Sequence, residues 1–137
     1  MVVIDASVAL AWSFEDEKHA AALELLDSIA AARALVPWHW WLEVSNGLLV
    51  ARRRRRLRRE PREILAALAA LPLRVDSDAL LTGTANSVLA LAETHGLSSY
   101  DAAYLELALR TGLPLATLDT DLAQAARAAG VALVVAA

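Results

Sequence analysis

Cysteine is absent from the 137-residue sequence, and lysine and histidine are scarce. The absence of cysteine excludes disulfides, cysteine-ligated zinc and thiol nucleophiles. The single lysine, Lys18, and the scattered histidines, His19, His39 and His95, lack the spacing of a zinc site or of a histidine-based ribonuclease. Any chemistry must therefore use carboxylates, hydroxyls, an isolated histidine or the backbone.

Long apolar runs are also missing, although 58% of the residues are hydrophobic. No run approaches the roughly 18 residues that a membrane helix needs. The opening MVVIDAS has neither the basic segment nor the cleavage site of a secretory signal, so we expect a cytoplasmic protein that spans no membrane. The length predicts one domain over residues 1–137, and the apolar excess is consistent with buried helices and an oligomer interface.

Short aliphatic runs alternate with longer segments that have helical apolar spacing. The predicted strands are 2–4, 35–36, 73–75, 114–118 and 131–135. The predicted helices are 15–32, 38 past Val50 into the run of arginines that begins at Arg52, 60–71, 76–94, 100–110 and 122–129, with an apolar turn at 9–12. This alternation predicts an α/β fold with a parallel sheet.

Acidic residues fall where a parallel sheet collects its ligands. Asp5 and Asp119 directly follow predicted strands, and ligands of such sheets bind beyond the carboxyl ends of the strands. Asp101 falls in the first turn of a helix that two serines precede, where the helix dipole favours a carboxylate. Glu43 lies among tryptophan, leucine and valine, so it either reaches solvent or faces a cation. Taken alone, Asp101 is also explained as an ordinary helix-start charge.

The four carboxylates together predict a metal site. Carboxylates within a few ångströms of one another repel and raise one another's pKa unless a divalent cation neutralises them. Mg²⁺ or Mn²⁺ prefers oxygen ligands and keeps several waters, one of which can serve as a nucleophile. The partner best matched to an anionic metal site is a phosphate, which the ion bridges to the protein.

Polar neighbours are candidates for supporting the site. Ser7 and Thr117 each lie two residues from one of the aspartates, so on extended backbone each would point to the same side as that aspartate. Asn46 lies one helical turn after the glutamate and can play the same part. Asp121 is a second-tier candidate ligand, since it either shares a face with the last aspartate or caps the last helix. The hydroxyls are also explained as ordinary turn and capping groups.

Basic residues are concentrated in one stretch. Eight of the thirteen are Arg52 to Arg56, Arg58, Arg59 and Arg62. The candidates for RNA contact are Arg52, Arg53, Arg55 and Arg56, through salt-dependent phosphate binding. The alternative is an exposed helix end with arginine near the negative pole of the dipole. The tryptophans at 38, 40 and 41 either stack on bases or pack in the core or a dimer contact.

Four segments, VVIDASV, WLEVSNGL, SSYDAAYLELA and LATLDTDL, together resemble the PIN-domain family, and most closely its bacterial VapC toxins. The resemblance implies a Rossmann-like α/β/α sandwich with a central parallel sheet, and Mg²⁺- or Mn²⁺-dependent endoribonuclease activity. It also implies a VapB-type antitoxin partner and a homodimer. The family's four acids fall on Asp5, Glu43, Asp101 and Asp119, with a hydroxyl partner at Thr117, whereas the position of Asp121 is acidic in only some relatives.

Three other functions compete with that of a toxin nuclease. A housekeeping PIN nuclease that processes RNA would carry the same acids. A PIN fold that has lost activity and acts as a binding or dimerisation module would have no need of them. A receiver-like phosphotransferase also places acids at strand ends, but it generally needs a lysine after a later strand, and Lys18 lies in the first long helix predicted.

Overall fold

The computed structural model describes residues 1–14, 20–78 and 82–135. At its centre is a five-stranded sheet with the order β3-β2-β1-β4-β5, in which every neighbouring pair is parallel. The strands are β1 (Val2–Ile4), β2 (Ala34–Val36), β3 (Leu73–Val75), β4 (Leu115–Ala116) and β5 (Leu133–Val135). The predicted parallel sheet is therefore confirmed, with its last two strands shorter than the sequence pattern indicated.

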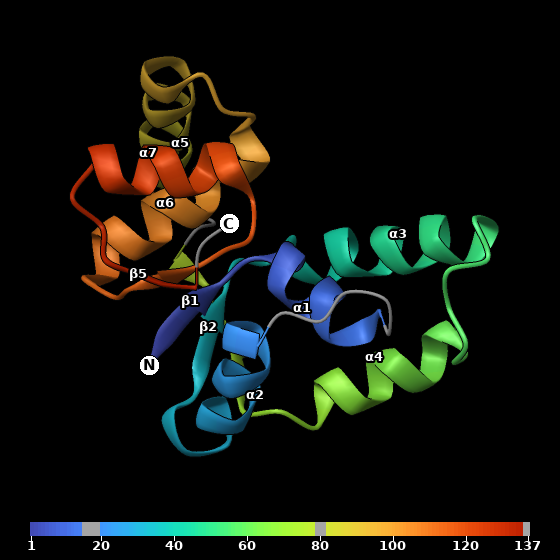
Figure 1. Cartoon of the computed structure of the whole chain (residues 1–137). Coiled ribbons are helices and arrows are strands. Elements are labelled where there is room, and N and C mark those ends of the chain that lie inside the picture. Colours follow the sequence, from blue (N-terminus) through green and yellow to red (C-terminus); the bar gives the residue numbers. More distant parts are fainter. Residues whose placement is uncertain (15–19, 79–81, 136–137) are drawn as a thin grey trace.

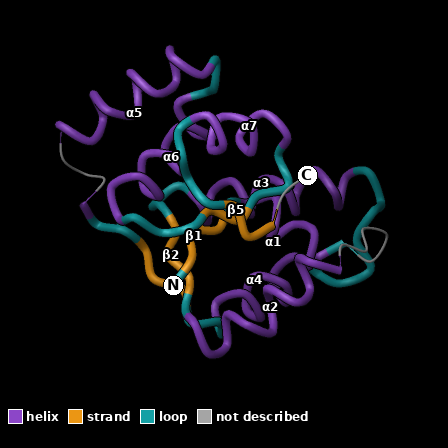
Figure 2. The backbone as a smooth tube through the Cα atoms, turned by 60° about the vertical axis from the view of Figure 1, so that its left-hand side comes forward, coloured by secondary structure: helices purple, strands orange, loops and turns teal. Residues whose placement is uncertain are grey.

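Helices cover both faces of this sheet. Figures 1 and 2 show α5, α6 and α7 on one side, and α1, α2, α3 and α4 on the other. Their bounds are α1 (Ala6–Ser13), α2 (Ala20–Ala32), α3 (Trp40–Arg53), α4 (Pro61–Ala69), α5 (Thr82–His95), α6 (Ser99–Thr111) and α7 (Thr120–Ala128). The expected α/β/α sandwich is confirmed. None of the helices in the described ranges is long and apolar enough to cross a membrane.

The predicted apolar turn at 9–12 was wrong, because these residues belong to α1. Four residues of α1, spread around the helix, are buried: Ala6, Val8, Ala9 and Ala11. A helix that is apolar on all sides has no amphipathic period by which it can be recognised in a sequence. The acidic residues 15–17, expected to open the next helix, lie outside the described residues.

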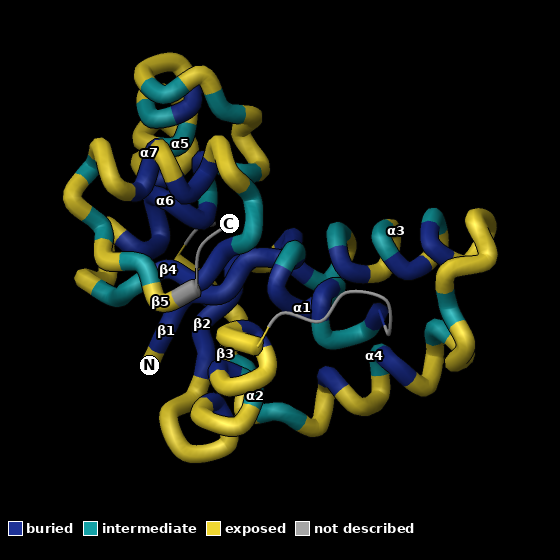
Figure 3. The backbone as a smooth tube through the Cα atoms, in the orientation of Figure 1, coloured by how far each residue is buried: buried dark blue, intermediate teal, exposed yellow. Residues whose placement is uncertain are grey.

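Burial follows the layered arrangement. Figure 3 shows β1 and β2 as buried, with the exposed backbone concentrated on the outer helices and loops. Trp40 is completely buried and joins the core, whereas Trp38 is exposed. The core alternative is thus correct for Trp40 but not for Trp38.

A close approach between α1 and α3 brings two of the acids toward each other. Gly47 of α3 lies against Leu10 of α1, and a Cβ atom at position 47 would meet Leu10 Cδ1 at 2.5 Å. The missing side chain therefore lets the two helices pack closely. Asp5 precedes α1 and Glu43 lies in the first turn of α3.

Arg110 ties the end of β3 to α6. Its guanidinium lies 2.7 Å from Asp76 Oδ2 and its Nε donates to Glu106 Oε1 at 2.7 Å. Both carboxylates are buried, whereas Arg110 keeps 27% of its side-chain surface accessible. A buried carboxylate is stable only when it is paired, so Arg110 is needed to hold both in place.

Replacing Arg110 by alanine should lower the free energy of unfolding by about 2 kcal/mol, because the change leaves two buried carboxylates without their shared cation. Breaking a fully buried pair costs about 3 to 5 kcal/mol, and the partial exposure of Arg110 reduces this cost. Urea denaturation measures the difference. Arg127→Ala, in the exposed last turn of α7, should change stability by less than about 0.5 kcal/mol. Equal losses in both variants would contradict the prediction.

Candidate active site

The sheet order places two of the predicted acids at its reversal point. From β1 the chain moves outward through β2 and β3, whereas β4 and β5 lie on the other side of β1. Asp5 directly follows β1, and Asp119 follows β4 after two intervening residues. The crevice outside the strand ends at such a reversal is where open α/β sheets bind ligands.

All four predicted acids meet in one cavity of about 210 Å³. Each stands at the start of a helix. Asp5 caps α1 by accepting from Val8 N at 3.2 Å, and Asp119 caps α7 by accepting from Leu122 N at 2.8 Å. Glu43 and Asp101 lie in the first turns of α3 and α6. The remaining lining residues are Ala6, Ser7, Leu10 and Tyr104.

Two hydroxyls hold Asp5 against the opposite loop. Ser7 Oγ donates to Asp5 Oδ1 at 2.6 Å, and Thr117 Oγ1 donates to Asp5 Oδ2. Each hydroxyl in turn accepts a backbone N–H from the loop after β4: Leu118 N at 2.8 Å for Ser7, and Asp119 N at 3.0 Å for Thr117. Both oxygens of the Asp5 carboxylate are thereby oriented.

The two hydroxyls reach Asp5 by a different route from the predicted one. Ser7 lies in the first turn of α1, so the assumed extended backbone was wrong there. Thr117 donates to Asp5 across the β1–β4 pair, whereas its own neighbour Asp119 caps α7. Neighbouring parallel strands end side by side, which brings Thr117 to Asp5.

Glu43 is held by two side chains, Tyr104 from α6 and His39 from one helical turn before it. Tyr104 Oη donates to Glu43 Oε1 at 2.7 Å, and His39 Nε2 lies 3.0 Å from the same oxygen. His39 Nε2 also lies 3.1 Å from the carbonyl oxygen of Tyr100. Because both neighbours are acceptors, this nitrogen must carry the proton. Asn46, the predicted partner, is exposed.

The hydrogen bonds on Glu43 also set its acidity. Burial acts to raise the pKa of Glu43, but the hydrogen bonds from His39 and Tyr104 outweigh it and hold that pKa below its ordinary value.

Tyr104 was not identified from the sequence as a residue of the site. The available signal was its position three residues after Asp101 in SSYDAAYLELA, which puts both on one side of a helix.

The pKa values of Asp5 and Asp101 are raised by burial and by the neighbouring carboxylates. Burial raises the pKa of Asp5 from 3.8 to about 6, the hydroxyl and backbone donors offset it only in part, and the charge of Asp119 adds to the rise. Burial likewise raises the pKa of Asp101, with further contributions from Asp119 and Glu43. These neighbouring charges oppose ionisation, which is the condition that a bound cation relieves.

The donor set fits a hard divalent cation in chemistry but is not yet arranged around one. Carboxylate oxygens are the ligands that Mg²⁺ and Mn²⁺ prefer. Within the described residues, no three histidine or acidic side chains already have the geometry of a metal site. Asp5, Glu43 and Asp119 each accept a hydrogen bond from the protein.

Some predicted residues lie outside the four-acid cavity. Asp121 is exposed in the first turn of α7 and lines a separate cavity of about 400 Å³ with His95 and Gln124. Arg53 lies ten residues after Glu43 on α3, which at 1.5 Å per residue is about 15 Å along the helix. Arg53 therefore lies too far along α3 to contact a phosphate held at the acids.

The sequence pattern of the PIN-domain family matches residues 2–128. The chain belongs to this family. Among solved structures, this PIN domain is similar to PAE2754 from Pyrobaculum aerophilum, with a TM-score of 0.68 and 23% identity over 97% of this chain and 83% of that one.

Two further structures share the fold. A toxin-antitoxin complex from Klebsiella pneumoniae has a TM-score of 0.58 and 18% identity over 87% of each chain. FitAcB from Neisseria gonorrhoeae has a TM-score of 0.59 and 19% identity over 97% of this chain and 96% of that one. No curated protein matches the sequence.

The metal-free PIN domain should lose stability as pH rises through the titration of Asp5, and the Asp5→Asn variant should lack that part of the pH dependence. Well below pH 3.8 the Asp5 carboxyl is protonated in both the folded and the unfolded chain. Between pH 3.8 and about 6 the unfolded chain ionises first, so Asp5 lowers the stability of the wild type by up to about 3 kcal/mol as pH rises, and the variant lacks this contribution. Denaturation in EDTA from pH 3.5 to 7 measures the difference, and a pH-independent difference would contradict it.

Proposed function

We propose that this PIN domain is a Mg²⁺- or Mn²⁺-dependent endoribonuclease whose metal ligands and catalytic groups are Asp5, Glu43, Asp101 and Asp119. The observation that carries the proposal is that all four acids line one cavity at the reversal point of the sheet. PIN domains are generally nucleases. Asp121 is left out of the set because it lines another cavity.

Each side chain of the cavity would have a distinct role in binding the metal and the phosphate. Asp5 would be a fixed ligand, because Ser7 and Thr117 orient both of its oxygens. Tyr104 and His39 would keep Glu43 ionised and aimed into the cavity. A phosphodiester could not approach four carboxylates unless a cation screened them. Mg²⁺ or Mn²⁺ bound there would supply an activated water and positive charge for the phosphate.

Helix ends provide a second source of positive potential. The N-termini of α1, α3, α6 and α7 all carry acids of this cavity. A helix N-terminus has a partial positive charge that favours anions. We infer that these four termini lower the cost of the gathered carboxylates and assist the binding of a phosphate.

We further propose that the protein is the toxin of a VapBC-type pair, with a VapB-type antitoxin that blocks the cavity and a cytoplasmic RNA as its target. One similar structure is a toxin-antitoxin complex from Klebsiella pneumoniae, which supports an antitoxin partner. A homodimer is proposed as well, since Leu42 and Leu49 on α3 are exposed large apolar side chains. Size-exclusion chromatography with light scattering tests the dimer.

Purified protein, screened against defined transfer and ribosomal RNAs, should cut at least one of them in the presence of Mn²⁺ or Mg²⁺ and leave 5′-phosphate and 3′-hydroxyl ends. EDTA should abolish cutting. Asp101→Asn should reduce the rate by at least roughly 100-fold, since even residues that only support metal ligands are worth about 10- to 100-fold. Denaturing gels and end-labelling measure both effects.

Glu93→Gln serves as the matched control, because this exposed carboxylate lies on α5 and outside the four-acid cavity. The control and Asp121→Asn should retain full activity. Cleavage that persists in EDTA, or full activity of the Asp101→Asn variant, would contradict the metal-dependent mechanism. A folded wild type that cuts none of these RNAs would point to a binding module instead.

We expect the arginine run to bind RNA at a point distant from the four acids. Arg52 lies 3.5 Å from Glu60 and Arg56 lies over the ring of Phe14, so Arg53 and Arg55 are the better test pair. Changing both to glutamine should reduce the salt slope of metal-free RNA binding by about 0.7 for each phosphate that the variant no longer binds. Fluorescence anisotropy with a single-stranded oligoribonucleotide measures the slope, and an unchanged slope would show that this end of α3 does not contact RNA.

A further inference from the structure

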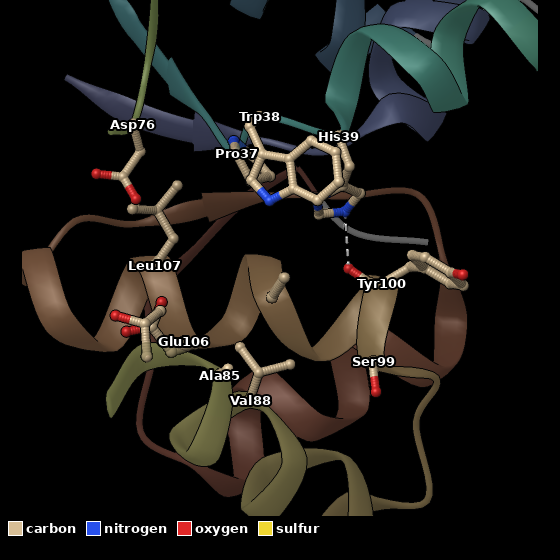
Figure 4. Close-up of a pocket in the computed structure, with 12 residues that line it drawn as sticks. Pro37, Trp38, His39, Asp76, Ala85, Val88, Ser99, Tyr100, Glu106 and Leu107 are labelled. Atoms are coloured by element: carbon tan, nitrogen blue, oxygen red, sulfur yellow. Dashed lines mark hydrogen bonds between the residues drawn. The ribbon is translucent and has the colours of Figure 1, made fainter. Parts of the chain in front are cut away.

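A second cavity, of about 460 Å³, lies beside the four-acid cavity. Its walls come from residues 37–39 between β2 and α3, from α5 and from one face of α6, and Asp76 after β3 closes one end. Figure 4 shows Asp76 and Glu106 on one side of the space, Tyr100 and Ser99 on the other, and Trp38 across the top. The volume is typical of small-ligand sites, which span roughly 300 to 1,000 Å³.

His39 forms a shared wall between the two cavities. It lines the larger cavity, and its Nε2 lies 3.0 Å from Glu43 Oε1, which belongs to the smaller one. Tyr100 lines the larger cavity, and the next residue, Asp101, lines the smaller. A polymer with one phosphate against the acids would therefore place an adjoining unit at the larger cavity.

Two aromatic side chains line the larger cavity while staying exposed. Trp38 is 54% exposed and Tyr100 is 67% exposed. The His39 ring lies between them, with centroids 5.8 Å from Trp38 and 6.1 Å from Tyr100. Aromatic rings normally gain stability from burial, and exposed rings grouped beside a cavity offer faces on which a flat ligand can stack.

The opposite side of the cavity carries net negative charge. Asp76 and Glu106 both line it, and both pair with Arg110. Asp76 also accepts from Asp78 N at 3.3 Å. Asp78 adds a third carboxylate 3.7 Å from Arg110, although its side chain is largely exposed. Because an ionised carboxylate accepts several hydrogen bonds, this side favours ligands that present N–H donors and disfavours ligands that present bare carbonyl oxygens.

We propose that the larger cavity receives one nucleobase of the RNA strand beside the scissile phosphate, and that it selects bases with an exocyclic amino group. Single-stranded RNA is read by stacking unpaired bases on aromatic rings and by hydrogen bonds to their edges. Adenine, cytosine and guanine each carry an amino group that can donate to Glu106, whereas uracil presents two carbonyl oxygens and one N–H. The inference rests on the proposed function only for the identity of the polymer.

Nucleosides test the pocket without any dependence on metal or cleavage. Adenosine, cytidine and uridine are titrated separately into ¹⁵N-labelled wild-type protein in EDTA, and amide and indole resonances are followed by NMR. Shifts should concentrate on Trp38, Ala85 and Ala103, which line the cavity. Adenosine and cytidine should bind roughly 2- to 10-fold more tightly than uridine, the effect of one hydrogen bond.

Trp38→Ala should weaken adenosine binding by roughly 5- to 100-fold, because a stacking surface is removed. The fold should survive, because Trp38 is exposed. Leu89→Ala is the matched control, since Leu89 has the same 54% exposure on α5 and does not line the cavity. Glu106→Gln should reduce the preference for adenosine over uridine. No binding, equal binding of the three nucleosides, or an unchanged Trp38→Ala variant would overturn the proposal.

Cleavage of oligoribonucleotides that vary at one position separates this inference from the proposed function. Nucleoside binding in a protein that cuts no RNA would defeat the nuclease and leave the base pocket standing. Metal-dependent cutting with no base preference beside the cut, and no nucleoside binding, would defeat the pocket alone. In that case the cavity would be assigned to an apolar side chain of a protein partner.

Discussion

The buried carboxylate of Asp5 is the interaction on which the site depends. Ser7 and Thr117 both donate to it, and both accept backbone N–H groups from the loop after β4. One carboxylate thus joins the end of β1, the start of α1 and the start of α7. Because each hydroxyl has a single hydrogen, accepting from the loop leaves that hydrogen free to point at Asp5, and the direction of the network is determined.

Gathering acids in this way works against stability. Burial and neighbouring charge raise the pKa of Asp5 and of Asp101, which means that the ionised forms cost free energy in the folded state. Helix N-termini and hydroxyl donors reduce that cost without removing it. A charge arrangement that is unfavourable by itself and favourable with a cation is what a metal-dependent active site requires.

Helix α6 organises both cavities. Asp101 and Tyr104 lie on the side that faces the four-acid cavity, while Tyr100, Glu106 and Leu107 line the larger one. The helical repeat of 3.6 residues separates these sets onto adjoining faces. A single rigid element therefore fixes the distance between the proposed site of cutting and the proposed site of base recognition, and His39 fills the wall between them.

Much of this architecture was determined by the sequence alone, because strand runs, helix caps and breaks are local signals. They predicted the parallel sheet, and the pattern of acids located Asp5, Glu43, Asp101 and Asp119. Only the tertiary structure decided which groups hold those acids. Thr117 reaches Asp5 across a strand pair, and Tyr104 reaches Glu43 from a helix 61 residues away in sequence. Such partners depend on which helix turns face one another, and this is set by packing between distant elements rather than by any local pattern.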